Sequence, residues 1–210
     1  MTEREALLGR VRQALRRSGE PPAPPPAPRL HIPAMSAEDR IASFTRALEA
    51  LAGKVYCAAS ASEARDRVEA LIAGKSAVAS NSPYLAECGI AALPGVQTGF
   101  TEEPALRRVC AAADVGITSA DYALADTGSL VLLSTAGEAR MISLLPLVHV
   151  AVVPRERLLT GLDELFTVLP NPSDFSSSLV IITGPSRTAD IEQILVRGVH
   201  GPREVHVVLI

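Results

Sequence analysis

The strongest constraint on the fold is a series of short aliphatic runs in a chain that has few aromatic residues to fill a core. Aromatic residues make up 3% of the 210 residues and tryptophan is absent, so Ala, Val, Leu and Ile must fill the interior. Short, continuous aliphatic runs are typical of parallel strands that are buried on both faces. We expect strands at residues 54–58, 76–80, 96–100, 114–119, 129–134, 148–153, 179–183 and 204–210.

Segments with helical periodicity separate many of these runs, and this alternation predicts parallel strands joined by right-handed crossovers. Ser36 is expected to cap a helix that ends at Gly53. Further helices are expected at residues 60–74, 103–112, 161–169 and 189–197. We therefore expect residues 36–210 to form one α/β domain with a mostly parallel sheet flanked by helices.

Residues 1–35 are expected to form a separate N-terminal arm. A short helix is predicted at residues 3–17, and the run PPAPPPAP at residues 21–28 predicts an extended spacer. Because short isolated helices are marginal in water, the arm is expected to dock on the main body, a second copy or a partner. A homodimer is compatible with this arrangement and is not required by it.

The composition excludes several classes of protein. The net charge of −3 gives no basic footprint for nucleic acid, and no apolar run is long enough to span a membrane. The N-terminus lacks the apolar stretch and cleavage site of a secretory signal. Cys57, Cys88 and Cys110 show no paired spacing and are interpreted as reduced, mostly buried thiols. We therefore expect a soluble, cytoplasmic protein.

The sequence lacks the motifs of the common catalytic and cofactor sites. It contains no C-x-x-C pair, no H-E-x-x-H, no G-x-S-x-G and no phosphate-loop lysine. Its scattered Cys and His residues form no metal constellation. We therefore predict no metal, no bound cofactor and no hydrolase triad.

The loop at residues 125–129 is the first candidate site. Asp126, Thr127 and Gly128 precede an aliphatic strand, and they offer a carboxylate, a hydroxyl and backbone amides within one turn. Glycine allows a positive φ or a close backbone approach. The turn is suited to binding the oxygens of a small ligand, or it is a plain turn stabilised by its own side chains.

The loop at residues 183–190 is the second candidate. Gly184 turns the chain, and Ser186, Arg187 and Thr188 precede a helix predicted to begin near Ala189. A helix N-terminus presents N–H groups, and an arginine suits a carboxylate or phosphate. In the alternative interpretation, Thr188 is an ordinary N-cap, and Asp190 satisfies the helix dipole internally.

The histidines divide between loops and strands. His200 lies in a loop beside Gly201, where functional residues are common. His149 and His206 lie within predicted strands, which favours a structural role for both. For His149 this role is a bond through one ring nitrogen, and the alternative is a general base or a ligand-binding group.

Four stretches together carry a family resemblance. The segments ADYALADTGSLVLL, RMISLLPLVHVAVV, GPSRTADIE and GVHGPREVHVVL, in this order, resemble the lactate-utilization protein C family, or LUD domain. The resemblance covers residues 36–210 and implies a fold similar to the sugar-phosphate isomerase and CoA-transferase group. It also implies a role beside iron–sulfur protein partners that oxidise L-lactate to pyruvate. This chain has no cysteine-rich motif, so it is not expected to be the electron-transfer subunit.

The resemblance also selects site residues, without giving each a chemical role. The residues predicted to bind a ligand are Asp126, Thr127, Gly128, Gly184, Ser186, Arg187, Thr188, Asp190, His200 and Gly201. This prediction requires the two candidate loops to converge at one rim of the sheet.

Three functions remain open. The first is an accessory subunit of a lactate-oxidising system that binds a small organic anion or stabilises its iron–sulfur partners. The second is a free-standing isomerase, transferase or thioester enzyme. Its general base would be Asp126, Glu138, Asp190 or His200, of which Asp126 and His200 are the catalytic candidates. The third is a non-catalytic interaction module.

Overall fold

The computed structural model describes residues 3–15, 34–135, 137–169, 178–188 and 196–210. The chain divides into two compact units, Met1–Leu30 and His31–Ile210. In the first unit, helix α1 (Glu3–Ala14) has no buried residue, and its apolar side chains Leu7 and Val11 are exposed. The predicted spacer at residues 21–28 lies outside the described residues.

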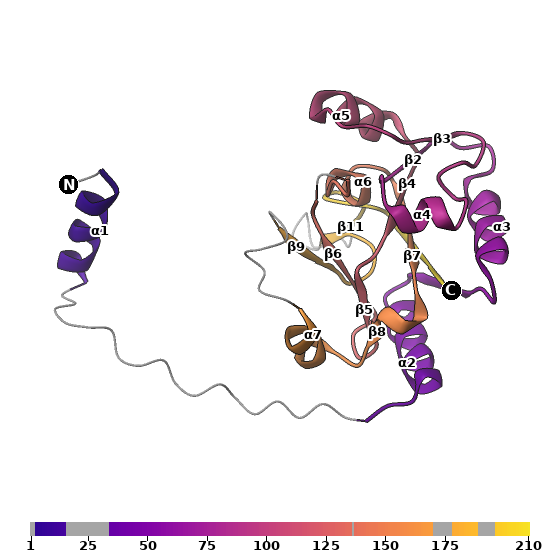
Figure 1. Cartoon of the computed structure of the whole chain (residues 1–210), viewed down its shortest axis with the longest axis horizontal. Coiled ribbons are helices and arrows are strands. Elements are labelled where there is room, and N and C mark those ends of the chain that lie inside the picture. Colours follow the sequence, from indigo (N-terminus) through magenta and orange to yellow (C-terminus); the bar gives the residue numbers. More distant parts are fainter. Residues whose placement is uncertain (1–2, 16–33, 136, 170–177, 189–195) are drawn as a thin grey trace. The chain divides into compact units, whose positions relative to one another are not determined.

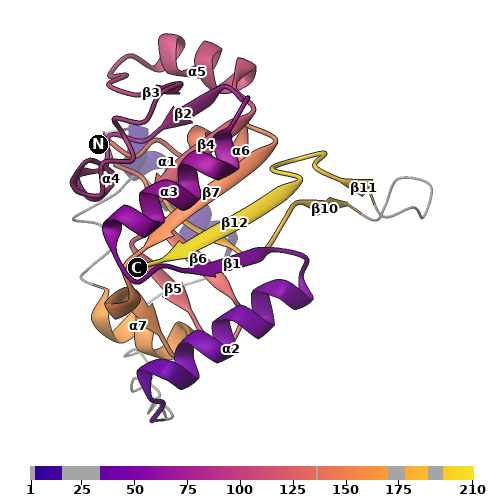
Figure 2. The same ribbon diagram turned by 90° about the vertical axis from the view of Figure 1, so that its right-hand side faces the viewer.

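The second unit is built around a six-stranded sheet in which every neighbouring pair of strands is parallel. Its strand order is β1-β12-β7-β4-β2-β3 (Figure 2). The strands are β1 (Lys54–Cys57), β12 (Glu204–Leu209), β7 (Val148–Val153), β4 (Val115–Ser119), β2 (Ala77–Ala79) and β3 (Val96–Gln97). The expected mostly parallel sheet of an α/β protein is confirmed.

A second, four-stranded sheet packs beside the first and was not separated from it by the sequence pattern. It has the order β8 (Leu158–Leu159), β5 (Tyr122–Leu124), β6 (Ser129–Leu133) and β9 (Leu179–Ile182). Strand β6 pairs antiparallel with both β5 and β9. Strands β5 and β8 were not predicted, because segments of three and two residues are too short to show a period.

Helices cover both faces of the large sheet (Figures 1 and 2). Helices α3 (Ala61–Ile72) and α4 (Pro83–Glu87) pack on one face, where Val68 and Leu85 join the core. Helix α2 (Ala37–Ala50) and the smaller sheet cover the other face through Phe44, Leu48 and Leu130. Helix α7 (Leu162–Val168) covers the outer side of the smaller sheet. The remaining helices are α5 (Glu103–Ala112), α6 (Met141–Leu144) and the 3₁₀ turn η1 (Arg155–Arg157).

Two predicted helix starts are fixed by local hydrogen bonds. The Ser36 hydroxyl accepts from the Asp39 N–H at 3.1 Å, so the predicted cap of α2 is confirmed. At α3, the Ser60 hydroxyl accepts from the Glu63 N–H at 3.2 Å, and the Glu63 carboxylate accepts from the Ala59 N–H at 2.7 Å. The first bond caps the helix, and the second holds the residue that precedes the cap.

The helix predicted at residues 189–197 is wrong where the structure describes it. Strand β10 (Arg187–Thr188) pairs antiparallel with β11 (Val196–Arg197), and residues 189–195 lie outside the described part. Beside this pair, the Gly198 N–H donates to the Ser186 carbonyl at 3.1 Å and extends the pairing of the two strands. The Ser186 N–H donates to the Pro202 carbonyl at 2.9 Å and joins the segment before β10 to the loop before β12. Tertiary pairing therefore overrides the local helical periodicity here.

Gly116 on β4 provides a test of the packing. A Cβ atom at this position would lie 1.9 Å from the carbonyl oxygen of Ile142 in α6. We expect Gly116→Ala to lower the unfolding free energy by about 3 kcal/mol, measured by urea denaturation, because α6 must move away from the sheet. Gly9→Ala in α1, with nothing within 4 Å, is the control and leaves the transition of the larger unit in place. An unchanged midpoint for Gly116→Ala would contradict this close packing.

Candidate functional site

Two adjoining cavities lie between α6 and the smaller sheet. The outer cavity has a volume of about 310 Å³, and the inner cavity has a volume of about 10 Å³, which is room for about one water. Arg140, Ser143 and Val180 line both cavities, so Arg140 stands where they meet. Strand β9 forms one wall of the outer cavity, and the start of α6 forms another.

The outer cavity combines aliphatic walls with cationic groups. Leu144 and the strand residues Val180, Ile181 and Ile182 supply the apolar surface, and the arginines are Arg140 and Arg187. The exposed Arg140 guanidinium makes no hydrogen bond or ion pair with any other described residue. This cavity can therefore hold an anionic group beside a small apolar one.

The Arg187 guanidinium is held by a contact that the sequence did not predict. One guanidinium N–H group donates to the carbonyl oxygen of Leu51, the residue that caps the C-terminus of α2. A cation at this end of a helix also opposes the negative end of the helix dipole. Because a guanidinium has five N–H donors, the bond to Leu51 leaves others for a ligand.

The loop that carries Arg187 depends on a glycine. Gly184 has a φ of +80°, and a Cβ atom there would lie 3.0 Å from the Leu51 Cβ. The turn brings Ser186 to the loop before β12, where the His200 N–H donates to the Ser186 hydroxyl at 3.4 Å. Five predicted site residues thus line one cavity: Gly184, Ser186, Arg187, His200 and Gly201.

The loop at residues 125–129 meets the loop after β9 but does not line the cavity. The hydroxyl groups of Ser129 and Thr183 are 2.8 Å apart, so the two loops lie side by side, but only residues of the second loop line the outer cavity. A Cβ atom on Gly128, which has a φ of +65°, would lie 2.4 Å from the backbone nitrogen of Leu48. Gly128 therefore allows this turn to pack against α2.

Asp126 and Thr127 are exposed beside the start of α7. The Asp126 N–H donates to the Thr160 carbonyl at 3.0 Å, and the Asp126 carboxylate faces Gly161. Thr127 accepts a hydrogen bond from the Ser129 hydroxyl at 2.8 Å. Thr188 lies in β10 and not at a helix start, and Asp190 lies outside the described residues. Ligand binding by these four residues stays a prediction.

The inner cavity contains a carboxylate that is partly withdrawn from water. Glu138 follows β6 and accepts a hydrogen bond from the Ser119 hydroxyl at the end of β4. Burial raises the pKa of the Glu138 carboxyl, and the charge of Asp121 also raises it, whereas the hydroxyls of Ser119, Ser82 and Ser80 oppose the shift. Among the general-base candidates that the structure describes, only Glu138 is partly buried, whereas Asp126 and His200 are exposed.

Asp121, which the sequence analysis did not select, lines the inner cavity as well. Burial raises the pKa of its carboxyl, and the hydrogen bond from the Leu133 N–H, at 2.7 Å, lowers it in part. Ser119 is the last residue of β4 and Asp121 follows it, and Ser80 and Ser82 follow the carboxyl end of β2. Ligands of open α/β sheets bind beyond these ends, so polar residues directly after each aliphatic run were the available signal.

His149 lies behind the inner cavity in the middle of the large sheet. It is fully buried, and its Nε2 atom lies 2.9 Å from the Thr118 hydroxyl, which lines the cavity. Burial lowers the pKa of His149 to about 4, and the charge of His206 acts in the same direction. The predicted bonding of His149 through one ring nitrogen is confirmed.

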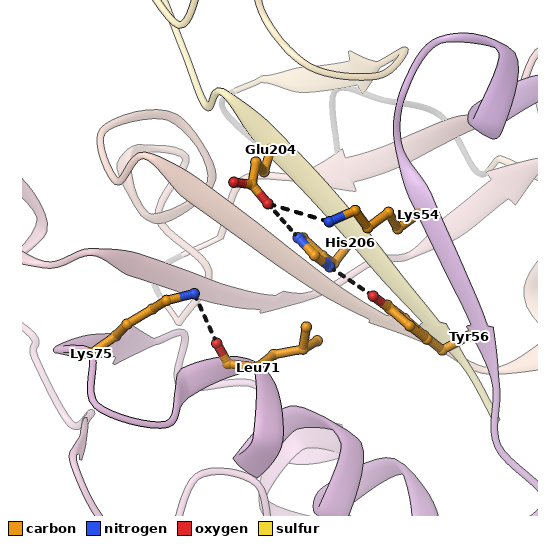
Figure 3. A network of polar contacts seen from close by, with 6 residues as sticks. All are labelled: Lys54, Tyr56, Leu71, Lys75, Glu204 and His206. Atoms are coloured by element: carbon orange, nitrogen blue, oxygen red, sulfur yellow. Dashed lines mark hydrogen bonds and ion pairs between the residues drawn. The ribbon is translucent and has the colours of Figure 1, made fainter.

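His206 belongs to a polar network on the sheet face covered by α3 (Figure 3). The Tyr56 hydroxyl lies 3.3 Å from His206 Nδ1, and a Glu204 carboxylate oxygen lies 3.0 Å from Nε2. Lys54 forms an ion pair with Glu204 at 3.7 Å. Both nitrogens of the largely buried imidazole thus have polar neighbours, which supports the structural role predicted for His206.

The described residues contain no group of three or more His, Cys, Asp or Glu side chains arranged to hold a metal ion. No helix in the same residues is long and apolar enough to cross a membrane.

The architecture defines an α/β protein with a parallel sheet, a smaller mixed sheet and a cavity beside the second sheet. Residues 41–210 match the LUD domain, and the chain belongs to that family. A solved DUF162 family protein from Deinococcus radiodurans shares the fold, with a TM-score of 0.65 and 20% identity over 84% of this chain and 99% of that one.

Curated relatives are named lactate utilization protein C. The protein from Halalkalibacterium halodurans is 45% identical over 94 residues, which cover 43% of this chain and 41% of the relative. That from Bacillus subtilis is 37% identical, covering 47% and 42%. That from Geobacillus kaustophilus is 33% identical over 158 residues, covering 69% and 66%. The chain thus matches about two fifths of the length of the first two relatives.

The buried His149 predicts a pH dependence of stability. Its folded pKa of about 4 lies below the ordinary 6.5, so the unfolded state binds an extra proton between these values. The unfolding free energy attributable to His149 therefore falls by about 2–3 kcal/mol between pH 7 and 4.5. His206, whose pKa is also lowered by burial, contributes in the same direction, whereas Glu138 and Asp121, with raised pKa values, oppose it.

Comparison with His149→Leu isolates the contribution of this one residue. Urea denaturation across this pH range is expected to give a flatter curve for the variant, because leucine does not titrate. The lost bond to Thr118 adds an offset that does not depend on pH. Parallel curves for the two proteins would exclude His149 as the titrating group.

Proposed function

We propose that this protein acts in L-lactate utilisation as a cytoplasmic accessory subunit that binds a small organic anion. The observation that carries the proposal is the outer cavity, where two arginines lie beside an aliphatic wall. Arg140 has no side-chain partner in the part of the chain that the structure describes, and Arg187 is anchored to Leu51. The relatives named lactate utilization protein C supply the metabolic context.

The chemistry of the cavity favours a carboxylate over an uncharged ligand. A guanidinium donates two parallel N–H bonds to a carboxylate, and such charge-assisted bonds are stronger than neutral ones. Thr183, Ser186 and His200 add hydroxyl and imidazole groups at the same cavity, and β9 supplies an apolar surface for a methyl group or a short chain. A 2-hydroxy or 2-oxo acid carries both features, a carboxylate and a small apolar end.

The surface around the outer cavity also supports a role beside other proteins. Leu144, Ile181 and Val199 are 37–40% exposed near its rim. Exposed apolar groups near a rim of polar residues are typical of interaction sites. We therefore extend the proposal to stabilisation of iron–sulfur partner proteins that carry out the electron transfer.

Anion binding is tested by calorimetric titration of the purified protein with L-lactate and with pyruvate. We expect Arg140→Gln to weaken binding by 10- to 100-fold, because a bond to a charged group contributes roughly 1.5–3 kcal/mol. Arg46→Gln, which changes an exposed arginine on α2 outside the cavity, is the matched control and retains affinity. Absence of binding of both anions to the unaltered protein would refute this part of the proposal.

The metabolic role is tested by deleting the gene and measuring growth on L-lactate. We expect growth on L-lactate to be lost, growth on glucose to be retained, and the unaltered gene to restore the phenotype. An accessory role further predicts that the abundance or activity of the iron–sulfur partners falls in the deletion strain. Normal growth with undiminished partner proteins would count against any role in lactate utilisation.

A further inference from the structure

Glu138 lies at a point where two strands of the large sheet and the smaller sheet meet. Its carboxylate is reached by Ser119 from the end of β4 and by Ser82 from the segment after β2. Its own loop is tied to that segment, because the Asn81 N–H donates to the Gly137 carbonyl at 2.8 Å. The carboxylate therefore has a fixed position, and the inner cavity opens beside it.

The hydroxyl of Ser80 gives a second, independent indication of a ligand. Ser80 is 1% exposed, and its hydroxyl lies near enough to lower the pKa of the Glu138 carboxyl, but the contact falls outside normal hydrogen-bond geometry and no other described residue bonds to this hydroxyl. A buried hydroxyl without a partner costs free energy. A ligand oxygen or a water beside Glu138 would supply the missing bond.

Arg140 and Ser143 line both the inner and the outer cavity, so the two cavities adjoin at these side chains. The inner cavity's volume of about 10 Å³ admits one small group and little further water. A short ligand whose carboxylate lies on Arg140 would thus place its neighbouring carbons close to Glu138.

We propose that Glu138 is an acid–base residue that removes and returns a proton at the carbon next to the carbonyl group of a 2-oxo acid. This inference rests on the anion site proposed above. Pyruvate is the simplest probe, because its methyl group lies next to the carbonyl and its carboxylate suits Arg140.

The step balances without an oxidant or a second substrate. The C–H bond breaks, its proton forms an O–H bond on Glu138, and its electron pair forms the carbon–carbon double bond of an enolate. The charge moves to the former carbonyl oxygen, where the Arg140 guanidinium and a cavity hydroxyl stabilise it. Return of a proton, after Glu138 has exchanged with solvent, regenerates the 2-oxo acid.

The surroundings of Glu138 are suited to this role. Partial burial makes the carboxylate a stronger base than an exposed one, and general bases are most effective when their pKa approaches the working pH. Asp121 faces the same cavity with a second carboxylate, and Arg140 is the cation that lines it. The hydrogen bond from the Ser119 hydroxyl holds the Glu138 carboxylate in one orientation.

The inference is tested by incubating the full chain with pyruvate in D₂O and following loss of the methyl signal by proton NMR. We expect the unaltered protein to accelerate exchange above buffer and Glu138→Gln to reduce the enhancement at least 100-fold. Ser119→Ala is expected to reduce the enhancement less than Glu138→Gln does, and Glu138→Asp is expected to retain part of the enhancement that Glu138→Gln loses. Asp163→Asn, on the exposed side of α7, is the matched control with full exchange.

Titration of each variant with pyruvate separates this inference from the anion site. Retained binding with lost exchange in Glu138→Gln supports the acid–base role. Binding to the unaltered protein without any exchange overturns the inference and leaves the anion site intact, whereas absence of binding overturns both. Equal exchange in the unaltered protein and in Glu138→Gln overturns the assignment to Glu138.

Discussion

The close approach of α6 to Gly116 is the constraint on which the site depends. A side chain at Gly116 would collide with the Ile142 carbonyl, so only glycine lets this short helix rest directly on β4. Glu138 and Arg140 lie immediately before α6, and Ser143 lies within it. The position of α6 thus fixes both the carboxylate of the inner cavity and the guanidinium that joins it to the outer one.

The large sheet and most helices were predictable because their signals are local. Aliphatic runs mark the strands, and Ser36 and Ser60 fix two helix starts by hydrogen bonds within one turn. The smaller sheet was less predictable, since β5 and β8 are short and nothing in the sequence separates strands of one sheet from those of another. The segment at residues 196–197 shows how pairing with β10 overrides a helical period.

Part of the candidate site was predictable because its residues lie close together in the sequence. Gly184, Ser186 and Arg187 are consecutive or nearly so, and the motif that contains them lines the outer cavity. Gly128 carried an equally clear turn signal, but the close approach that it permits is to Leu48 and not to a ligand. Arg140 and Asp121 were not among the predicted ligand-binding residues, because their place in the site arises from α6 and β4 meeting the smaller sheet, which only the tertiary structure shows.

Strand β9 and the loop that follows it form much of the outer cavity wall, while most buried side chains of the core come from other segments. Val180, Ile181 and Ile182 are all at least partly accessible, and β9 has β6 as its partner within the smaller sheet. Substitutions at Val180 and Ile181, which pack against none of the core clusters, therefore alter the cavity wall with less effect on folding than substitutions in the core. The shape of this cavity can change in evolution while the rest of the scaffold is inherited unchanged.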